Sequence, residues 1–199
     1  MAYPTVSKPY GFQPINRVDG MAYAGAIRQL PISQAGAIYN GDLVELDVGG
    51  VVGSASSLTA GAKLGVFVGC QYTNAAGQTI QAQYYPGSSV TNAIAYVVVD
   101  ENAAYKVAVT NGSGVMSSTT AKAVGVNLAV DQEAGSTTTG NSGNGVTAPT
   151  AGTGNAATLP VKVIAVVPET AIDATNFREV IVVLNNPQLT SATGGVDFA

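Results

Sequence analysis

The sequence predicts an all-β protein, a single-domain β-sandwich or β-barrel of about ten short strands. Apolar residues recur with the two-residue period of half-buried strands. Turn-forming residues such as Gly, Asn and Pro separate these segments at intervals of about 8–12 residues, and no amphipathic helix of useful length is present. The chain has 199 residues, of which 46% are hydrophobic, so it can bury a core of ordinary size.

Residues 1–19 are expected to form an extended N-terminal arm. Pro4, Pro9 and Pro14 each fix φ, remove a backbone donor and disfavour helix at the preceding residue. Such an arm either lies along its own domain or reaches a neighbouring subunit. The candidate interaction residues, which we expect to anchor the arm to a partner, are Tyr3, Tyr10, Phe12 and Ile15.

The β domain is expected to span residues 20–189. In residues 42–48, Val44, Leu46 and Val48 alternate with acidic residues, which predicts a strand with those three side chains facing inward. Further strands are expected, in order, at residues 23–32, 51–52, 64–72, 78–85, 124–130, 159–167 and 180–184.

The stretch Ile94–Val109 is the most strongly patterned part of the chain and predicts a β-hairpin. Residues 94–99 form a nearly unbroken apolar run rich in β-branched residues, which fits a strand buried on both faces. Residues 104–109 alternate, as in a half-buried strand, and residues 100–103 are a polar connection of hairpin length. We expect the first strand to be central, with the other strands assembled around it.

Residues 135–158 consist almost wholly of Gly, Ser, Thr, Asn and Ala. Because this composition offers too little apolar surface to bury, we expect a long, exposed, flexible low-complexity loop inside the β domain. Residues 190–199 are expected to be a polar C-terminal tail.

Catalytic and metal chemistry has little support in the sequence. There is no histidine, which excludes Ser-His and Cys-His nucleophilic pairs and histidine metal sites. Cys70, the single cysteine, is expected to be a small buried apolar residue. Strand geometry places Asp42 on the face opposite Glu45 and Asp47, so these three predict no metal site. We expect no catalytic residue, no cofactor and no metal.

Two further features have simple structural interpretations. Asp100 and Glu101 resemble a glycosidase carboxylate pair, but a position at a hairpin tip favours ordinary turn residues. Tyr84 and Tyr85 stand beside a turn and could form a ligand platform, although packing on an edge strand is the favoured interpretation.

Charge is sparse. Only 10% of the residues are charged, with 8 Lys and Arg and a net charge of −4, against roughly 25% charged residues in typical domains. No basic patch supports nucleic-acid binding. No apolar run approaches the ~20 residues of a membrane span, and the N-terminus has no apolar export signal, so we expect synthesis in a cytoplasm. A sparsely charged surface suits a protein covered by partners in an assembly.

Several stretches, taken together and in order, resemble a family of small structural proteins of tailed bacteriophages. These are head decoration, or cement, proteins that bind the outside of the capsid. Residues 135–158 and the tail beyond residue 189 have no counterpart in the resemblance. The matching stretches are residues 10–14, 23–25, 30–32, 39–44, 65–69, 84–86, 96–100, 159–164 and 182–188.

The resemblance implies a non-catalytic protein on the outer capsid surface of a virion, which clamps neighbouring capsomers against internal DNA pressure. Its implied partners are the major capsid protein and itself, as a homotrimer in preference to a dimer, with no nucleic acid and no membrane. Two alternatives remain, namely another virion part, such as a tail tube or fibre-attachment protein, and a carbohydrate-binding or adhesin-like β domain. An enzyme is the least favoured class.

Overall fold

The computed structural model describes residues 6–22, 25–53, 63–111, 124–147, 157–167, 177–185 and 187. Within these ranges the chain forms strands and no helix, so the all-β prediction is confirmed. The strands are β1 (Gln13–Arg17), β2 (Ile27–Pro31), β3 (Leu43–Asp47), β4 (Gly50–Gly53), β5 (Gly65–Thr73), β6 (Thr79–Ala82), β7 (Thr91–Val98), β8 (Ala103–Asn111), β9 (Asn127–Asp131), β10 (Gly145–Thr147), β11 (Val161–Val166) and β12 (Glu179–Leu184).

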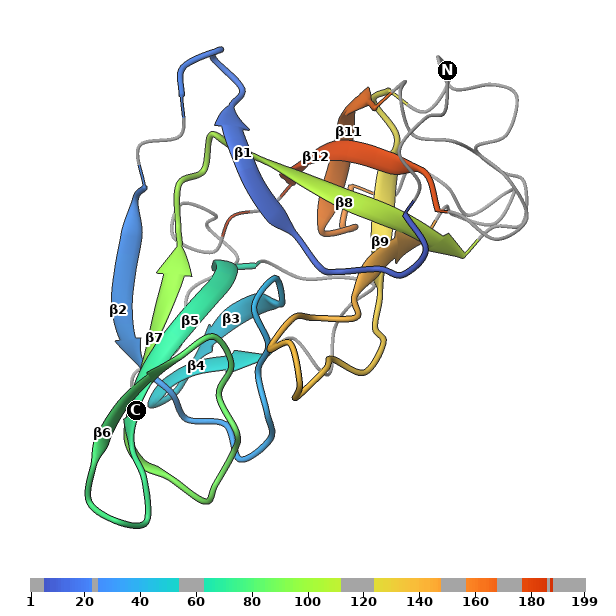
Figure 1. Ribbon diagram of the computed structural model, residues 1–199. Coiled ribbons are helices and arrows are strands. Elements are labelled where there is room, and N and C mark those ends of the chain that lie inside the picture. The colour runs from blue at the N-terminus through green and yellow to red at the C-terminus, as the bar shows by residue number, and fades with distance from the viewer. Residues whose placement is uncertain are drawn as a thin grey trace.

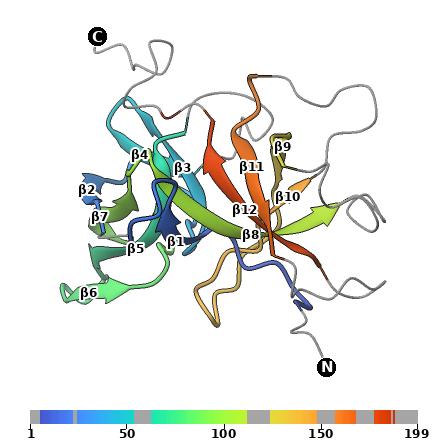
Figure 2. The same ribbon diagram turned by 90° about the horizontal axis from the view of Figure 1, so that it is seen from above.

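The strands form two six-stranded sheets that lie side by side (Figures 1 and 2). The first has the order β1-β8-β10-β9-β11-β12, and β12 also pairs with β8. Strands β8 to β12 therefore close into a five-stranded barrel, to which β1 adds along β8. The β8–β10 pair is parallel and the other pairs are antiparallel.

The second sheet has the order β2-β7-β5-β3-β4, and β6 pairs with the end of β5. Its pairs are antiparallel. The ends of this sheet approach each other just beyond β2, where Ile32 forms a parallel bridge with Val51 of β4. Strand β7 lies between β2 and β5, so the prediction that residues 94–99 belong to a central strand is confirmed.

The predicted hairpin over Ile94–Val109 is wrong. β7 pairs with β2 and β5, whereas β8 pairs with β1, β12 and β10. The short connection between them carries the chain from one sheet to the other (Figure 1). The alternation of side chains fixes which face of a strand is apolar, but it does not specify the neighbouring strand.

Two apolar clusters fill the interior. One lies within the second sheet and includes Val44, Phe67 and Val97. The other fills the barrel and extends to the second sheet through Leu43, Val66 and Val98, with Phe12. Because neighbours in sequence alternate between the two clusters, β3, β5 and β7 are each buried on both faces. Burial on both faces was predicted for β7 from its continuous apolar run, whereas β3 was predicted to be only half-buried.

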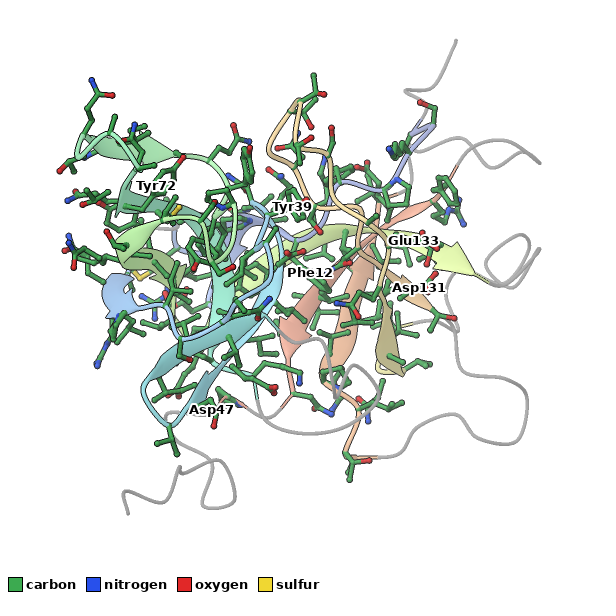
Figure 3. All side chains as sticks on the ribbon, turned by 90° about the horizontal axis from the view of Figure 1, so that it is seen from below. Phe12, Tyr39, Asp47, Tyr72, Asp131 and Glu133 are labelled. Atoms are coloured by element: carbon green, nitrogen blue, oxygen red, sulfur yellow. The ribbon has the colours of Figure 1, made fainter. Side chains whose placement is uncertain are left out.

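The boundary expected at residue 19 does not separate a free arm from the domain. Residues Gln13–Arg17 are strand β1, which pairs antiparallel with β8, and Phe12 is fully buried. Figure 3 places Phe12 between the strands of the two sheets. Within the described part of this segment, residues Gln13–Arg17 are extended, and their strand is added to the protein's own sheet.

The loop expected over residues 135–158 is only partly exposed. Gly140, Ser142, Asn144 and Gly145 are buried, and β10 supplies a strand of the barrel. Small residues permit this burial because the backbone can approach its neighbours closely and pair its polar groups there. Residues 148–156, and the tail expected at 190–199, lie outside the described ranges. Among the described residues there is no helix long and apolar enough to cross a membrane.

Candidate interaction surface

A cluster of polar side chains holds the Gly-rich loop against the turn that precedes β3. Asp42 Oδ1 accepts hydrogen bonds from Ser142 Oγ at 2.6 Å and Asn144 Nδ2 at 2.8 Å. Its Oδ2 accepts a third bond, from the Tyr39 backbone N–H, at 2.8 Å. Ser142 and Asn144 are buried. We call Asp42, Ser142 and Asn144 the junction.

Backbone hydrogen bonds connect the junction to both sheets. The Ser142 N–H donates to Asn40 O at 2.8 Å, and the Gly11 N–H donates to Asn144 O at 3.0 Å. On the other side, the Gly41 N–H donates to Phe67 O at 2.9 Å. The junction therefore ties the segment before β1, the turn before β3 and the loop before β10 into one unit, and its groups are occupied by structural bonds.

Burial of the charged Asp42 carboxylate at the junction costs free energy. Burial raises the pKa of Asp42 above its ordinary value, while hydrogen bonds from Ser142 and Tyr39 offset part of that rise. A buried carboxylate loses hydration that hydrogen bonds replace only in part. Because the pKa is raised, the folded state holds the Asp42 proton at a higher pH than the unfolded state does.

Gly11 lies where the chain crosses the junction. Its φ is +82°, in the left-handed region that favours glycine. A Cβ at this position would lie 2.7 Å from Gly41 O and 2.7 Å from Ser142 Cβ. The close packing of the junction therefore requires glycine here for two independent reasons.

The expected arm anchors contact their own domain. Phe12 is part of the barrel cluster, and Ile15 is half-buried on β1. The Tyr10 hydroxyl donates a hydrogen bond to Glu179 of β12. Tyr3 lies outside the described ranges. The Phe12 ring fills the protein's own core in this structure, and an anchoring role for these residues in an assembly stays a prediction.

Tyr10 belongs to a small polar group on the barrel surface. Lys106 Nζ lies 3.1 Å from Glu179 Oε1 and 5.7 Å from the centroid of the Tyr10 ring. Burial raises the pKa of Tyr10, and the hydrogen bond to the Glu179 carboxylate and its negative charge raise it further. The hydroxyl is thus protonated and fixed as a donor, which attaches the segment before β1 to β12.

The tyrosines near residue 84 pack against the protein. The rings of Tyr39 and Tyr84 are stacked, with centroids 5.6 Å apart and planes 12° apart. Gly135 lies so close to the Tyr39 ring that a Cβ there would overlap it, and Tyr85 is buried. Packing, the favoured interpretation of these residues, agrees with this arrangement better than an open ligand platform does.

The remaining predicted residues have structural contacts. Cys70 is buried, as predicted, and burial raises the pKa of its thiol to about 12. Glu45 Oε2 lies 3.2 Å from the Nζ of buried Lys63, so the partly exposed Glu45 carboxylate is held in an ion pair. Asp100 accepts a bond from the Asn102 N–H at 2.9 Å, as turn residues do. Within the described ranges, no three His, Cys, Asp or Glu residues gather as a metal site would require.

Exposed apolar side chains gather at one end of the molecule. Five large apolar residues are exposed in the described part of the chain. Three of them, Val18 at 53%, Met21 at 61% and Ile27 at 49% exposure, lie between the end of β1 and the start of β2. Figure 1 shows the end of β1, the start of β2 and the β7–β8 connection at this same end. We call this surface the rim. It consists of the apolar residues Val18, Met21 and Ile27 and the charged residues Arg17, Asp19, Arg28, Asp100 and Glu101.

The rim is held in place by backbone bonds. The Val18 N–H donates to Asn102 O at 2.8 Å, and the Arg17 N–H donates to Met21 O at 3.0 Å. Ile27 lies opposite Val98 of β7, which is buried in the barrel cluster. The exposed apolar rim is therefore a continuation of the apolar contact between the two sheets.

The rim is rich in charged residues, although only 10% of the residues in the chain are charged. Arg17 pairs with Asp19 at 3.4 Å and with Asp100 at 3.2 Å. Arg28 and Glu101 are exposed and belong to none of the ion pairs among the described residues. Both line a shallow groove of about 670 Å³ together with Ile27 and other rim residues.

The junction and the rim were not predicted from the sequence. Nothing local distinguishes Ser142 or Asn144 from other small polar residues of the loop, because their partner lies about a hundred positions earlier. Val18 and Met21 lack the alternation by which buried and exposed positions were assigned. The one available signal at the rim was the presence of apolar residues in a segment rich in turn formers.

Comparison with known proteins identifies no relative, since no protein-family model, no curated protein and no solved structure matches this chain.

Proposed function

We propose that this chain is a structural virion protein that binds the outer surface of a phage capsid and cements neighbouring capsomers, without catalysis. The observation that carries the proposal is the rim, an apolar surface on a sparsely charged protein. Exposed apolar patches with a polar border are typical of interaction sites. The partners in this proposal are the major capsid protein and further copies of the chain, as a trimer in preference to a dimer.

The arrangement of the resembling stretches supports the proposal. Residues 10–14, 39–44, 65–69 and 96–100 are far apart in sequence but contact one another. The Phe12 N–H donates to Gly41 O at 2.9 Å, and β5 pairs with β7. The resemblance to head decoration proteins therefore falls on one connected part of the fold.

Low charge supports a contact made by shape and apolar burial. Charge-steered association weakens steeply as salt screens the charges, whereas apolar contacts do not. A capsid protein bound in this way would stay attached at high ionic strength. The same property would suit a clamp that has to resist the pressure of packaged DNA under changing external conditions.

The experiment that tests the proposal measures the heat stability of capsids. Shells that lack the protein are heated with and without the purified chain, and DNA release is followed by dye binding. We expect the added chain to bind the shells, to raise the release temperature, and to do so equally at about 0.1 and 1 M salt. Bovine serum albumin at equal mass is the control. An unchanged release temperature with no bound chain would contradict the proposal.

A further inference from the structure

We propose that the rim binds a second copy of this chain, with Arg28 of one copy facing Glu101 of the next. The inference rests on the part of the proposed function that names further copies of the chain as partners, and it assigns that contact to the rim. It starts from three properties of the rim: exposed apolar side chains, two charged residues of opposite sign outside every ion pair among the described residues, and a backbone held in place by hydrogen bonds.

The apolar part favours a protein partner. Val18, Met21 and Ile27 are about half exposed or more, although the barrel cluster continues directly behind Ile27 through Val98. Each side chain that a partner covers removes apolar area from water and gains about 25 cal/mol per Å². The bonds from Val18 and Arg17 to neighbouring backbone already fix the surface, so binding requires little additional ordering.

The charges favour a copy of the same chain. Arg17 pairs within the chain with both Asp19 and Asp100, which leaves Arg28 and Glu101 as the rim charges without an ion pair in the described ranges. Both border the same groove. In a cyclic assembly of copies around the rim, each Arg28 meets a neighbour's Glu101, so every copy pairs both charges at once.

A patch of one sign would repel a copy of itself, whereas Arg28 and Glu101 offer one charge of each sign to a second copy. This complementarity is the reason for choosing a second copy over a different protein. The contact uses neither Phe12 nor Tyr10, whose side chains serve the core and the barrel surface. The pairing of Arg28 with Glu101 is compatible with two-fold or three-fold symmetry, and the measured mass distinguishes these.

The test is sedimentation velocity of the purified full-length chain over a concentration series. We expect the wild type to form a discrete oligomer and Ile27→Asp to sediment as a monomer. Arg28→Glu and Glu101→Arg should each raise the dissociation constant about tenfold or more, because like charges then face each other. The double variant Arg28→Glu/Glu101→Arg should regain the wild-type association, since it restores opposite charges at every contact.

Controls separate association from folding. Val48→Asp changes an apolar residue that is 64% exposed at the β3–β4 turn, outside the rim, and should leave the oligomer intact. Far-UV circular dichroism should show each rim variant to be folded. If Ile27→Asp does not fold, the charge-reversal pair still tests the proposal, because Arg28 and Glu101 are both exposed.

Three outcomes would overturn the inference. The wild type could be a monomer at every concentration, Ile27→Asp could keep the wild-type mass, or the double variant could fail to regain association. Because the assay contains no shells, its failure is distinguishable from failure of the capsid proposal.

Discussion

At the rim, Val18, Met21 and Ile27 are exposed to solvent, whereas at the junction Ser142 and Asn144 are withdrawn from it. The junction residues are polar, yet their hydrogen bonds to Asp42 and to backbone groups permit burial. The rim residues are apolar, yet nothing in the described part of the chain covers them. The polarity of the residues alone would therefore predict the wrong burial for both regions. The hydrogen-bonding and packing partners of each residue decide whether it is buried. We expect the junction to serve folding and the rim to serve association.

The largest expected effect is a difference in stability loss between substitutions at two residues that lie opposite each other on β2 and β7. Val98 is buried and Ile27, its cross-strand partner, is half exposed. Val98→Asp should destabilise the fold by more than about 4 kcal/mol, because it buries a charge without a partner. Ile27→Asp should cost less than about 1 kcal/mol. Urea denaturation followed by circular dichroism measures both. A folded Val98→Asp protein would show that the contact between the sheets is not central.

The second prediction compares two glycines with nearly the same backbone angle. Gly11 at the junction has φ +82° and no room for a Cβ, whereas Gly20, between Val18 and Met21, has φ +81° and no atom of the described residues within 4 Å of an added Cβ. Gly11→Ala should cost about 2–4 kcal/mol, from strain and overpacking together. Gly20→Ala should cost only the backbone strain, about 1 kcal/mol. Equal losses in thermal unfolding of the two variants would contradict the tight packing of the junction.

The third prediction concerns the segment before β1. Tyr10→Phe removes the hydroxyl that donates to Glu179, and should lower the free energy of unfolding by about 1–2 kcal/mol, because the acceptor is charged. Tyr72→Phe is the matched control, since no hydrogen bond joins the Tyr72 hydroxyl to the described residues, and it should change stability by less than about 0.5 kcal/mol. Unfolding in guanidinium measures the free energy of unfolding of both variants. An unchanged stability of Tyr10→Phe would mean that this hydrogen bond does not hold the segment.

The smallest expected effect is the pH dependence of the junction. The pKa of Asp42 is raised in the folded state above its ordinary value of 3.8. The stability that Asp42 gains from its proton is therefore fully present below about pH 3.8 and is lost as pH rises through the higher folded pKa. Asp42→Asn cannot titrate, so the wild type minus the variant in free energy of unfolding should fall as pH rises through this window. A difference that rises with pH would mean that hydrogen bonds outweigh burial.

Much of the fold was predictable from the sequence, because strands leave a local signal. The strands near residues 44, 66, 97 and 182 follow from alternation or from continuous apolar runs. Val48 was wrongly placed inward, since it belongs to the β3–β4 turn and is 64% exposed. The partner of each strand was not predictable, because pairing depends on residues far away in the chain. For this reason the pattern of residues 94–109 predicts a hairpin, although β7 and β8 belong to different sheets.

The candidate surfaces were predictable to a smaller extent. The prolines predict an extended segment, but the sequence does not indicate whether its aromatic residues pack on their own domain or on a partner, and Phe12 lies in the core. The composition of residues 135–147 indicates little apolar burial, although Val146 is fully buried in the barrel core. This composition does not indicate that close backbone approach and hydrogen bonding bury the segment instead.

The most direct test of the proposed function is the position of the chain on the virion. Gradient-purified particles are labelled with gold-conjugated antibodies against the purified chain and viewed by electron microscopy. We expect label over the outer surface of the head, at many copies per particle, with none on the tail. Particles treated with a competing excess of the free chain are the control for specific labelling. Label confined to the tail, or intact particles that carry no label, would contradict the account.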